Sequence, residues 1–345
     1  MKVSIVTNMV PFVYGGGEIH VNSLVRKLEE YGHQPELIRL PFAWDTPSKI
    51  AESMLAVRLA NLVNTDKVIA MKFPAYYIEH PDKTVWLIHQ FRQAYDLAGT
   101  EYDFFTDSFE HQKVKRAIIQ ADNRFFGSMP GRIYTNSHIT TERLRHFNGI
   151  DSSVLYPPLD NAEDFYCGEY GDYFFYPSRV NNSKRQQLAV EAMRYVKSSV
   201  KLILAGKGDT KEDEEQVLAL IEKYALSDKV KYYNRFISEQ EKIDLYADAL
   251  GILFIPYNEE FGYITLEAFH SHKPMITCHD SGGPVYFVER SEAGYVTAPE
   301  PQALAEKMDA LYAKKSKAKE MGEAGYRLID TLGINWENVI GSLLK

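Results

Sequence analysis

The regular alternation of short apolar runs with longer amphipathic stretches constrains the fold of this sequence more than any other feature. Short apolar runs bounded by Gly, Pro, Asn or Asp are typical of buried strands, and the stretches between them have helical spacing. We expect strands at 2–8, 34–40, 67–72, 84–90, 132–137, 173–178, 200–206, 230–235, 250–256, 274–280 and 293–298. This pattern predicts an α/β chain whose parallel sheets are covered by helices.

The first amphipathic stretch, residues 18–32, shows why a helix is expected between the strands. Its apolar residues fall on one helical face: Ile19, Leu24, Val25, Leu28. A glycine, Gly32, follows the last of them and is a common residue just beyond a helix end.

The segment "VLYPPLDNAEDFYCGEYGD" interrupts the alternation with two prolines and a turn-rich acidic run, so we place a domain boundary near residues 156–170. The chain is therefore expected to form two Rossmann-like, doubly wound domains, 1–160 and 161–330. Residues 331–345 are expected to form a helix that packs back on the first domain. Ligands of such sheets bind beyond the carboxyl ends of the strands, so a cleft between the domains is the expected site.

Composition excludes several classes of protein. The net charge of -8 argues against a nucleic-acid partner, which would need a concentrated basic face. Two cysteines, Cys167 and Cys278, are too few for a disulfide scaffold or a zinc site, so we expect a cytoplasmic protein. No run has the roughly 18–20 apolar residues that a membrane-spanning helix needs.

The loop "VYGGGEIHV" follows the first expected strand and opens a helix, where backbone N–H groups suit a phosphate. An NAD-dependent dehydrogenase is one alternative, but His20 occupies the third glycine position of its fingerprint. The second strand also lacks the acidic residue that would hold the ribose of NAD. A tight turn without a ligand explains this loop equally well.

Basic and glycine residues recur at the strand ends of the second domain. Arg179 and Lys184 lie five residues apart in "SRVNNSK", where a guanidinium and an ammonium could hold a diphosphate. Gly206 and Gly208 in "LAGKGD", and the glycine pair at 282–283, would let a backbone approach the same ligand.

Two carboxylates flank a strand-to-helix turn in "NEEFGYITLEAFHSHKP". Glu259 and Glu267 are eight residues apart, and Gly262 lies between them. Their spacing puts one carboxylate in the loop and the other on the helix, so they first suggest an acid/base pair.

These segments together resemble the retaining glycosyltransferases of family 4, the group 1 glycosyltransferases, which have the GT-B fold. The resemblance runs through essentially the whole chain and is most specific in the segment from Glu259 to Pro284. It implies an N-terminal acceptor domain and a C-terminal nucleotide-sugar donor domain. It also implies transfer of a hexose from a UDP- or GDP-sugar to a glycan or lipid-linked acceptor, with retention at the anomeric carbon.

The resemblance assigns roles to individual side chains. Glu267 would accept hydrogen bonds from the ribose hydroxyls, and Glu259 would face the hydroxyls of the donor sugar. Arg179 and Lys184 would neutralise the leaving diphosphate, and His89 would face the transferred sugar from the first domain.

It also implies backbone contacts. Consecutive N–H groups would contact the donor sugar and its diphosphate: Phe261, Gly262, Tyr263, Ile264, Thr265. Gly16 and Gly206 would approach the donor closely, and Phe236 and Ile237 would lie near its base. The sequence departs from the family at Ser178, where glycine is common, and at Tyr286, where glutamate is usual.

No metal is expected, because the chain lacks an Asp-x-Asp motif at a strand end and its His, Cys and carboxylate residues lack metal-ligand spacing. Two alternatives keep the same architecture. One is a nucleotide-sugar epimerase or sugar-phosphate synthase, and the other is a non-catalytic subunit that binds a sugar nucleotide.

Residues 111–134 gather basic side chains beside Phe125 and Phe126: Lys113, Lys115, Arg116, Arg124, Arg132. A solvated helix over the first core is the better-supported interpretation. The alternative is an interfacial surface for a lipid-linked acceptor, which would make the protein peripheral to the inner face of a membrane.

Overall fold

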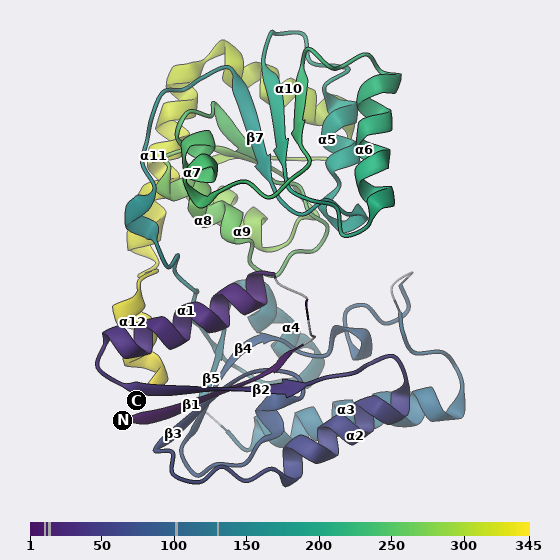
Figure 1. The fold of residues 1–345 in the computed structure, drawn as a ribbon, viewed down its shortest axis with the longest axis vertical. Coiled ribbons are helices and arrows are strands. Elements are labelled where there is room, and N and C mark those ends of the chain that lie inside the picture. Colours follow the sequence, from purple (N-terminus) through teal and green to yellow (C-terminus); the bar gives the residue numbers. More distant parts are fainter. Residues whose placement is uncertain (10–11, 13–14, 101–102, 130) are drawn as a thin grey trace. The chain divides into compact units, whose positions relative to one another are not determined.

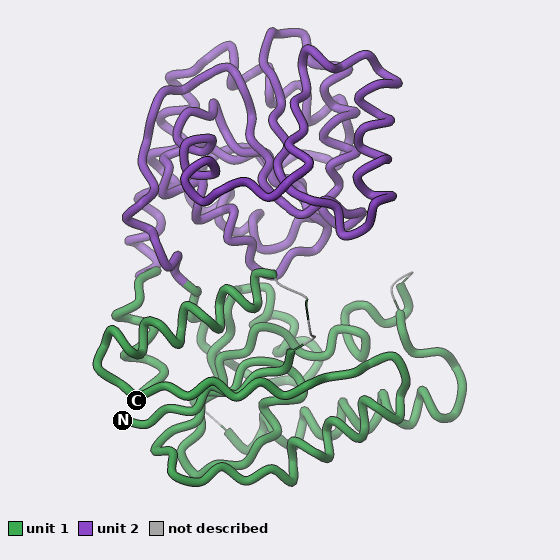
Figure 2. The backbone as a smooth tube through the Cα atoms, in the orientation of Figure 1, with its two compact units in different colours: residues 1–157, 334–345 green, residues 158–333 purple. Residues whose placement is uncertain are grey.

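A computed structural model describes residues 1–9, 12, 15–100, 103–129 and 131–345. The chain divides into two compact units, which we describe separately (Figure 2). Unit 1 contains Met1–Pro157 and Ile334–Lys345, and unit 2 contains Pro158–Gly333.

Unit 1 is built on a six-stranded parallel sheet with the order β2-β1-β3-β4-β5-β6. Its strands are β1 (Lys2–Met9), β2 (Gln34–Pro41), β3 (Lys67–Lys72), β4 (Lys83–His89), β5 (Ile133–Thr135) and β6 (Ser153–Val154). The first five coincide with expected strands. The sixth was missed, because two residues are too few to produce an apolar run.

Helices cover both faces of this sheet (Figure 1). They are α1 (Gly16–Glu30), α2 (Pro47–Leu59), α3 (Phe109–Gly127), α4 (His138–Asn148) and α12 (Trp336–Leu343), with short 3₁₀ turns η1 (Ala75–Tyr77) and η2 (Arg92–Ala94). Alternate residues of β3 enter different cores, as the pleat requires. Val68 and Ala70 pack with residues of α2, α3 and α4, whereas Ile69 and Met71 pack with α1 and α12.

The helical face expected for α1 was partly wrong. Leu24 and Leu28 are buried as expected, but Ile19 is 55% exposed. His20 and Val21 point inward instead, and the His20 ring lies 4.1 Å from the ring of Trp86. We expected Ile19 on the inner face only because it is apolar. The residues near the middle of the helix determine which side faces the core, and Ile19 falls on the other side.

Unit 2 has a second six-stranded parallel sheet with the order β12-β11-β10-β7-β8-β9, the order of a doubly wound nucleotide-binding sheet. Its strands are β7 (Tyr173–Pro177), β8 (Lys201–Ala205), β9 (Val230–Tyr233), β10 (Gly251–Leu253), β11 (Met275–Cys278) and β12 (Gly294–Thr297). The two sheets confirm the predicted GT-B fold class.

The helices of unit 2 follow its strands in turn. They are α5 (Gln186–Ala192), α6 (Lys211–Lys223), α7 (Glu239–Ala247), α8 (Tyr263–His270), α9 (Gly283–Ser291), α10 (Pro301–Ala313) and α11 (Lys315–Thr331), with 3₁₀ turns η3 (Ala162–Asp164) and η4 (Asn182–Lys184). No helix in the described part of the chain is long and apolar enough to cross a membrane.

A carboxylate is fully buried in unit 1. Asp122 on α3 accepts hydrogen bonds from three tyrosine hydroxyls, those of Tyr76 (2.8 Å), Tyr77 (2.5 Å) and Tyr95 (2.6 Å). Burial raises the pKa of Asp122 from 3.8 to about 6, and the three hydrogen bonds only partly offset this effect.

The buried carboxylate predicts a pH dependence of stability that Asp122→Asn should remove. Because the folded pKa lies above the unfolded one, the contribution of Asp122 is complete below pH 3.8 and is lost as the pH rises through about 6. The loss is about 3 kcal/mol in the free energy of unfolding. Urea unfolding of both proteins between pH 4 and pH 8 measures it. Parallel stability curves for the two proteins would contradict the assignment.

Candidate active site

Most helices of this protein begin in one of two ways. A side chain accepts a hydrogen bond from the first turn of α2, α3, α4, α6, α7 and α12. By contrast α1, α8 and α9 begin after Gly15, Gly262 and Gly282, and no side chain of the described residues caps them. The first N–H groups of α1 and α8 therefore remain available to an anionic ligand at the carboxyl edges of the sheets. In α9 the Gly283 N–H is already bonded to Glu259 O, and Pro284 has no N–H group.

Glycine is required at the starts of both α8 and α9. Gly262 has φ +79°, and a Cβ there would lie 2.6 Å from the ring of Phe254. Gly282 has φ +77°, and its Cβ would lie 2.3 Å from the carbonyl oxygen of Glu259. Hydrogen bonds join the two loops, because Gly283 N donates to Glu259 O over 2.8 Å and Glu259 N donates to Ser281 O over 3.1 Å.

The side chains of Lys184 and Glu259 meet between these loops. Lys184 ends the turn η4 after β7, Glu259 follows β10, and the Lys184 ammonium forms an ion pair with the Glu259 carboxylate. Both side chains are largely buried. Strands β7 and β10 are neighbours and flank the point where the strand order reverses, which is where doubly wound sheets bind ligands.

Arg179 engages a different carboxylate from Lys184. Its Nη1 lies 2.5 Å from Asp209 Oδ1, beyond the end of β8, and the Arg179 side chain is 46% exposed. Asn181 donates to the other oxygen of Asp209 over 2.8 Å. The two cations expected at the diphosphate are thus both at this sheet edge, but each has its own acidic partner.

Glu267 lies on α8 and faces α7. Its Oε1 accepts from the Lys242 ammonium over 2.7 Å, and its Oε2 accepts from the Tyr246 hydroxyl over 2.6 Å. Burial lowers the pKa of Lys242, but the Glu267 and Glu239 carboxylates outweigh it, so that pKa is raised. A carboxylate has about four acceptor positions, which leaves Glu267 able to accept from a ligand as well.

Sequence reasoning missed Arg185, which joins the loops around Lys184 and Glu259. Its guanidinium donates two hydrogen bonds of 2.8 Å to Asp280, one to Ile255 O over 2.7 Å, and one to Pro256 O over 2.7 Å. This clamp fixes the backbone on either side of Glu259. The sequence did contain a hint of this clamp, because a second basic residue directly follows Lys184 and the acidic Asp280 lies two residues before Gly282.

The remaining expected donor-site residues of unit 2 lie on the same edge. Phe261 is buried, with its ring 5.2 Å from that of Tyr263, and Thr265 is fully buried, whereas Ile264 is half-buried. Gly206 has φ +147° and follows β8, where a Cβ would lie 2.0 Å from Ser178 O. Phe236 and Ile237 lie between β9 and α7, and Phe236 is 76% exposed.

In unit 1 the expected residues Gly16 and His89 are at the carboxyl edge of the sheet. Gly16 is the first residue of α1; Val13 and Tyr14 of its loop lie outside the described residues. His89 ends β4, is paired in register with Lys72 of β3, and its Nδ1 lies 2.7 Å from Gln90 O. The sequence analysis did not select Lys72 as a site residue, because it stands at the end of an apolar strand. Its ammonium lies 3.2 Å from Glu18, on the first turn of α1.

Among the described residues there is no group of three or more His, Cys, Asp and Glu side chains that could hold a metal ion. The absence of a metal requirement remains a prediction from the sequence.

Comparisons with known proteins place this site in a family context. The family model described as glycosyl transferases group 1 matches residues 168–328. The human alpha-1,3/1,6-mannosyltransferase ALG2 is 28% identical over 257 residues, which cover 67% of this chain and 60% of the human protein. The chain thus spans about 60% of the length of that curated relative.

Solved structures resemble the fold of the whole chain. Sucrose-phosphate synthase from Thermosynechococcus elongatus has a TM-score of 0.75 at 16% identity and covers 99% of this chain and 98% of its own. HepE of Anabaena, solved in complex with UDP and glucose, has a TM-score of 0.70 at 15% identity and covers 99% of both chains. At such low identities these likenesses concern the fold alone.

Proposed function

We propose that this chain is a group 1 glycosyltransferase, since that family model matches residues 168–328 and a mannosyltransferase is 28% identical over 67% of the chain. It moves a hexose from a UDP- or GDP-sugar to a hydroxyl group of a glycan or glycolipid. The anomeric configuration is retained, and no metal ion is needed.

The ion pair of Lys184 and Glu259 carries this proposal. It places an ammonium and a carboxylate at the switch point of unit 2, beside the uncapped first turn of α8. A sugar diphosphate needs both kinds of group, since its phosphates need cationic and N–H donors and its sugar hydroxyls need an acceptor. Glu267 supplies a further acceptor at the same edge for the ribose.

The proposed chemistry balances without a protein nucleophile. The bond between the sugar C1 and the diphosphate oxygen breaks, and C1 forms a bond to the acceptor oxygen. The proton of the acceptor hydroxyl passes to the leaving phosphate. Lys184 and the first N–H groups of α8 would stabilise the negative charge that develops on the diphosphate, as a metal does in other transferases.

Mannose is the sugar that the comparisons favour, because ALG2 is named a mannosyltransferase. The family match does not favour the alternative of an epimerase or sugar-phosphate synthase. The carboxyl edge of unit 1 is a suitable place for the acceptor, since Lys72, whose ammonium pairs with Glu18, and His89 are paired in register there.

A donor screen with the purified protein tests the proposal. We expect transfer to a mannose-containing acceptor from GDP-mannose or from one UDP-hexose, detected by mass spectrometry, with the rate in excess EDTA within about twofold of that without it. The products should carry the same anomeric configuration as the donor, measured by NMR. Loss of activity in EDTA that Mg²⁺ restores would contradict metal independence, and epimerised donor without acceptor would contradict transfer.

A further inference from the structure

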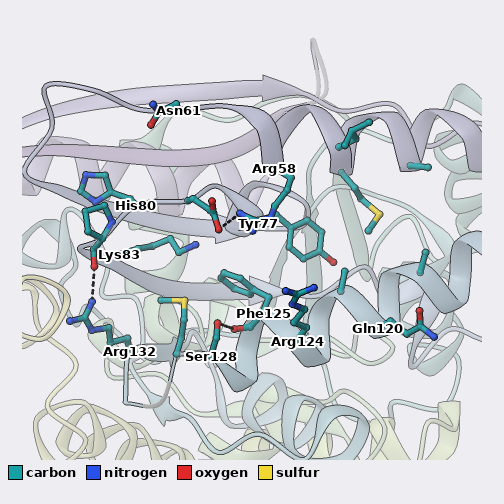
Figure 3. A pocket seen from close by; sticks show the side chains of 18 residues that line it. Arg58, Asn61, Tyr77, His80, Lys83, Gln120, Arg124, Phe125, Ser128 and Arg132 are labelled. Carbon is teal, nitrogen blue, oxygen red and sulfur yellow. Dashed lines mark hydrogen bonds and ion pairs between the residues drawn. The ribbon is translucent and has the colours of Figure 1, made fainter.

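Unit 1 contains a groove of about 1350 Å³ between α2 and α3 (Figure 3). It is at the other end of the sheet from the uncapped helix α1, because His80, Pro81 and Lys83 precede or begin β4, and Arg132 precedes β5. The reaction proposed above therefore leaves this groove without a role.

The groove has a basic end and an apolar end. On α2, Met54 and Leu55 come before Arg58, and on α3, Ala117 and Ala121 come before Arg124. Figure 3 shows Gln120 of α3 at one end and His80, Lys83 and Arg132 at the other. Between Ala117 and Arg124 the helix rises about 10 Å, so the apolar part is long enough for an alkyl chain.

Charge in the groove is strongly unbalanced. Four cationic side chains line it, namely Arg58, Lys83, Arg124 and Arg132, against the carboxylate of Glu79. Glu79 pairs with Arg58. Arg132 donates to the carbonyl oxygen of Pro81 over 3.3 Å and lies 3.8 Å from the carboxylate of Asp82, next to the groove, so Lys83 and Arg124 are the cations of the lining without a carboxylate partner among the described residues. A basic concentration of this kind on a chain with a net charge of -8 indicates an anionic ligand.

Lys83 is the most unusual of these cations because its side chain is buried. Its ammonium donates to the carbonyl oxygens of Tyr76 and Ile78 and lies 4.3 Å from the centre of the Phe125 ring. Within the described ranges it forms no ion pair with a carboxylate. Burial lowers the pKa of Lys83 to about 8, and a bound anion would offset that desolvation.

Apolar side chains are also exposed next to the groove. Leu55 lines it and is 59% exposed, and Leu59 at the end of α2 is 74% exposed. Val63, in the segment after α2, is 79% exposed. A soluble anion such as a nucleotide would leave these side chains in water, whereas an acyl chain would cover them.

We propose that this groove binds one anionic phospholipid of a membrane surface, with its phosphate at the basic end and an alkyl chain along the apolar side chains of α2 and α3. The site is separate from the donor site in unit 2, so it would recruit the enzyme to its lipid without taking part in transfer. Both parts of the ligand are needed for tight binding. The phosphate pairs with the cations, and the alkyl chain buries the apolar surface of the groove.

Calorimetric titration with decyl phosphate below its micellar concentration tests the site, with inorganic phosphate as the comparison. We expect decyl phosphate to bind at least tenfold more tightly, because each buried methylene group contributes about fourfold in affinity. Arg124→Glu should weaken decyl phosphate binding tenfold or more. Arg116→Glu is the matched control, because Arg116 lies exposed on the same helix and does not line the groove.

Two further measurements complete the test. Ala121→Trp should fill the apolar part of the groove and weaken decyl phosphate binding without affecting inorganic phosphate. Sedimentation with vesicles of phosphatidylglycerol should be reduced by Arg124→Glu and retained by Arg116→Glu, with thermal unfolding as the check on folding. Equal losses in the two charge-reversal variants, or equal affinities for decyl phosphate and inorganic phosphate, would overturn the proposal.

Discussion

Replacing Lys184 by methionine is expected to lower kcat by about two to three orders of magnitude while changing the KM for the donor far less. Negative charge develops on the diphosphate only as the bond to the sugar breaks, so an ammonium that meets this charge acts mainly in the transition state. Lys184 is suited to this role because it is 17% exposed, where water screens its charge little.

The variant leaves the carboxylate of Glu259 without its partner, so a loss of stability has to be separated from a loss of chemistry. The double variant Lys184→Met/Glu259→Gln removes both charges and should recover stability without recovering kcat. Lys201→Met is the matched control, because Lys201 is exposed at the amino end of β8, on the same sheet but at the opposite edge. Its kcat should stay within about twofold of the parent protein.

Initial rates at saturating donor and acceptor, together with urea unfolding of each variant, give the measurement. A kcat for Lys184→Met within threefold of the parent would show that Lys184 holds Glu259 and does not meet the diphosphate. The charge would then have to come from Arg179, which is more exposed and already paired with Asp209.

The fold was predictable from the sequence because strand and helix periodicity are local properties. β3 illustrates this, since each of its six residues is buried and alternate residues supply two different cores. The glycines of the candidate site were also recognisable, because Gly262 and Gly282 occupy conformations that other residues rarely adopt.

The partners of the charged residues could not be predicted in the same way. Glu267 pairs with Lys242, which is 25 residues earlier, and Arg185 with Asp280, which is 95 residues later. Such pairs depend on which strands become neighbours, and a chain with many acidic residues offers several partners for each cation. For the same reason Arg179 and Lys184, which the sequence places together, take separate carboxylates.

Part of the lining of the groove in unit 1 comes from a segment that the sequence analysis had already selected. Residues 111–134 suggested either a solvated helix or an interfacial surface, and membrane contact stays a prediction. Arg116, Arg124 and Arg132 are all exposed, but only Arg124 and Arg132 line the groove, together with Phe125. The rest of the lining comes from α2 and from the segment between η1 and the start of β4, whose contribution no pattern in residues 111–134 could reveal.

Replacing Glu267 by alanine is expected to weaken nucleotide binding by about 100-fold. A carboxylate that accepts from two ribose hydroxyls makes two charge-assisted hydrogen bonds, each of which contributes about 1.5–3 kcal/mol. Lys242 and Tyr246 each donate to one oxygen of Glu267, so they fix the orientation of its carboxylate toward a ligand. Glu267→Gln keeps one good acceptor and should lose about tenfold. Isothermal titration calorimetry of each variant with UDP and with GDP measures both losses of affinity.

The ion pair of Glu267 with Lys242 also provides the control. Glu267→Ala and Lys242→Met break the same 2.7 Å contact from opposite sides, and each also loses one further partner, Tyr246 or Glu239, so both should lower the free energy of unfolding. If Glu267 is a purely structural partner of Lys242, both variants should bind the nucleotide equally. If Glu267 binds the ribose, only its replacement weakens nucleotide binding, and the nucleotide affinity of Lys242→Met stays within about threefold of that of the parent protein. Equal nucleotide affinities in the two variants would therefore refute the ribose assignment even if both proteins were destabilised.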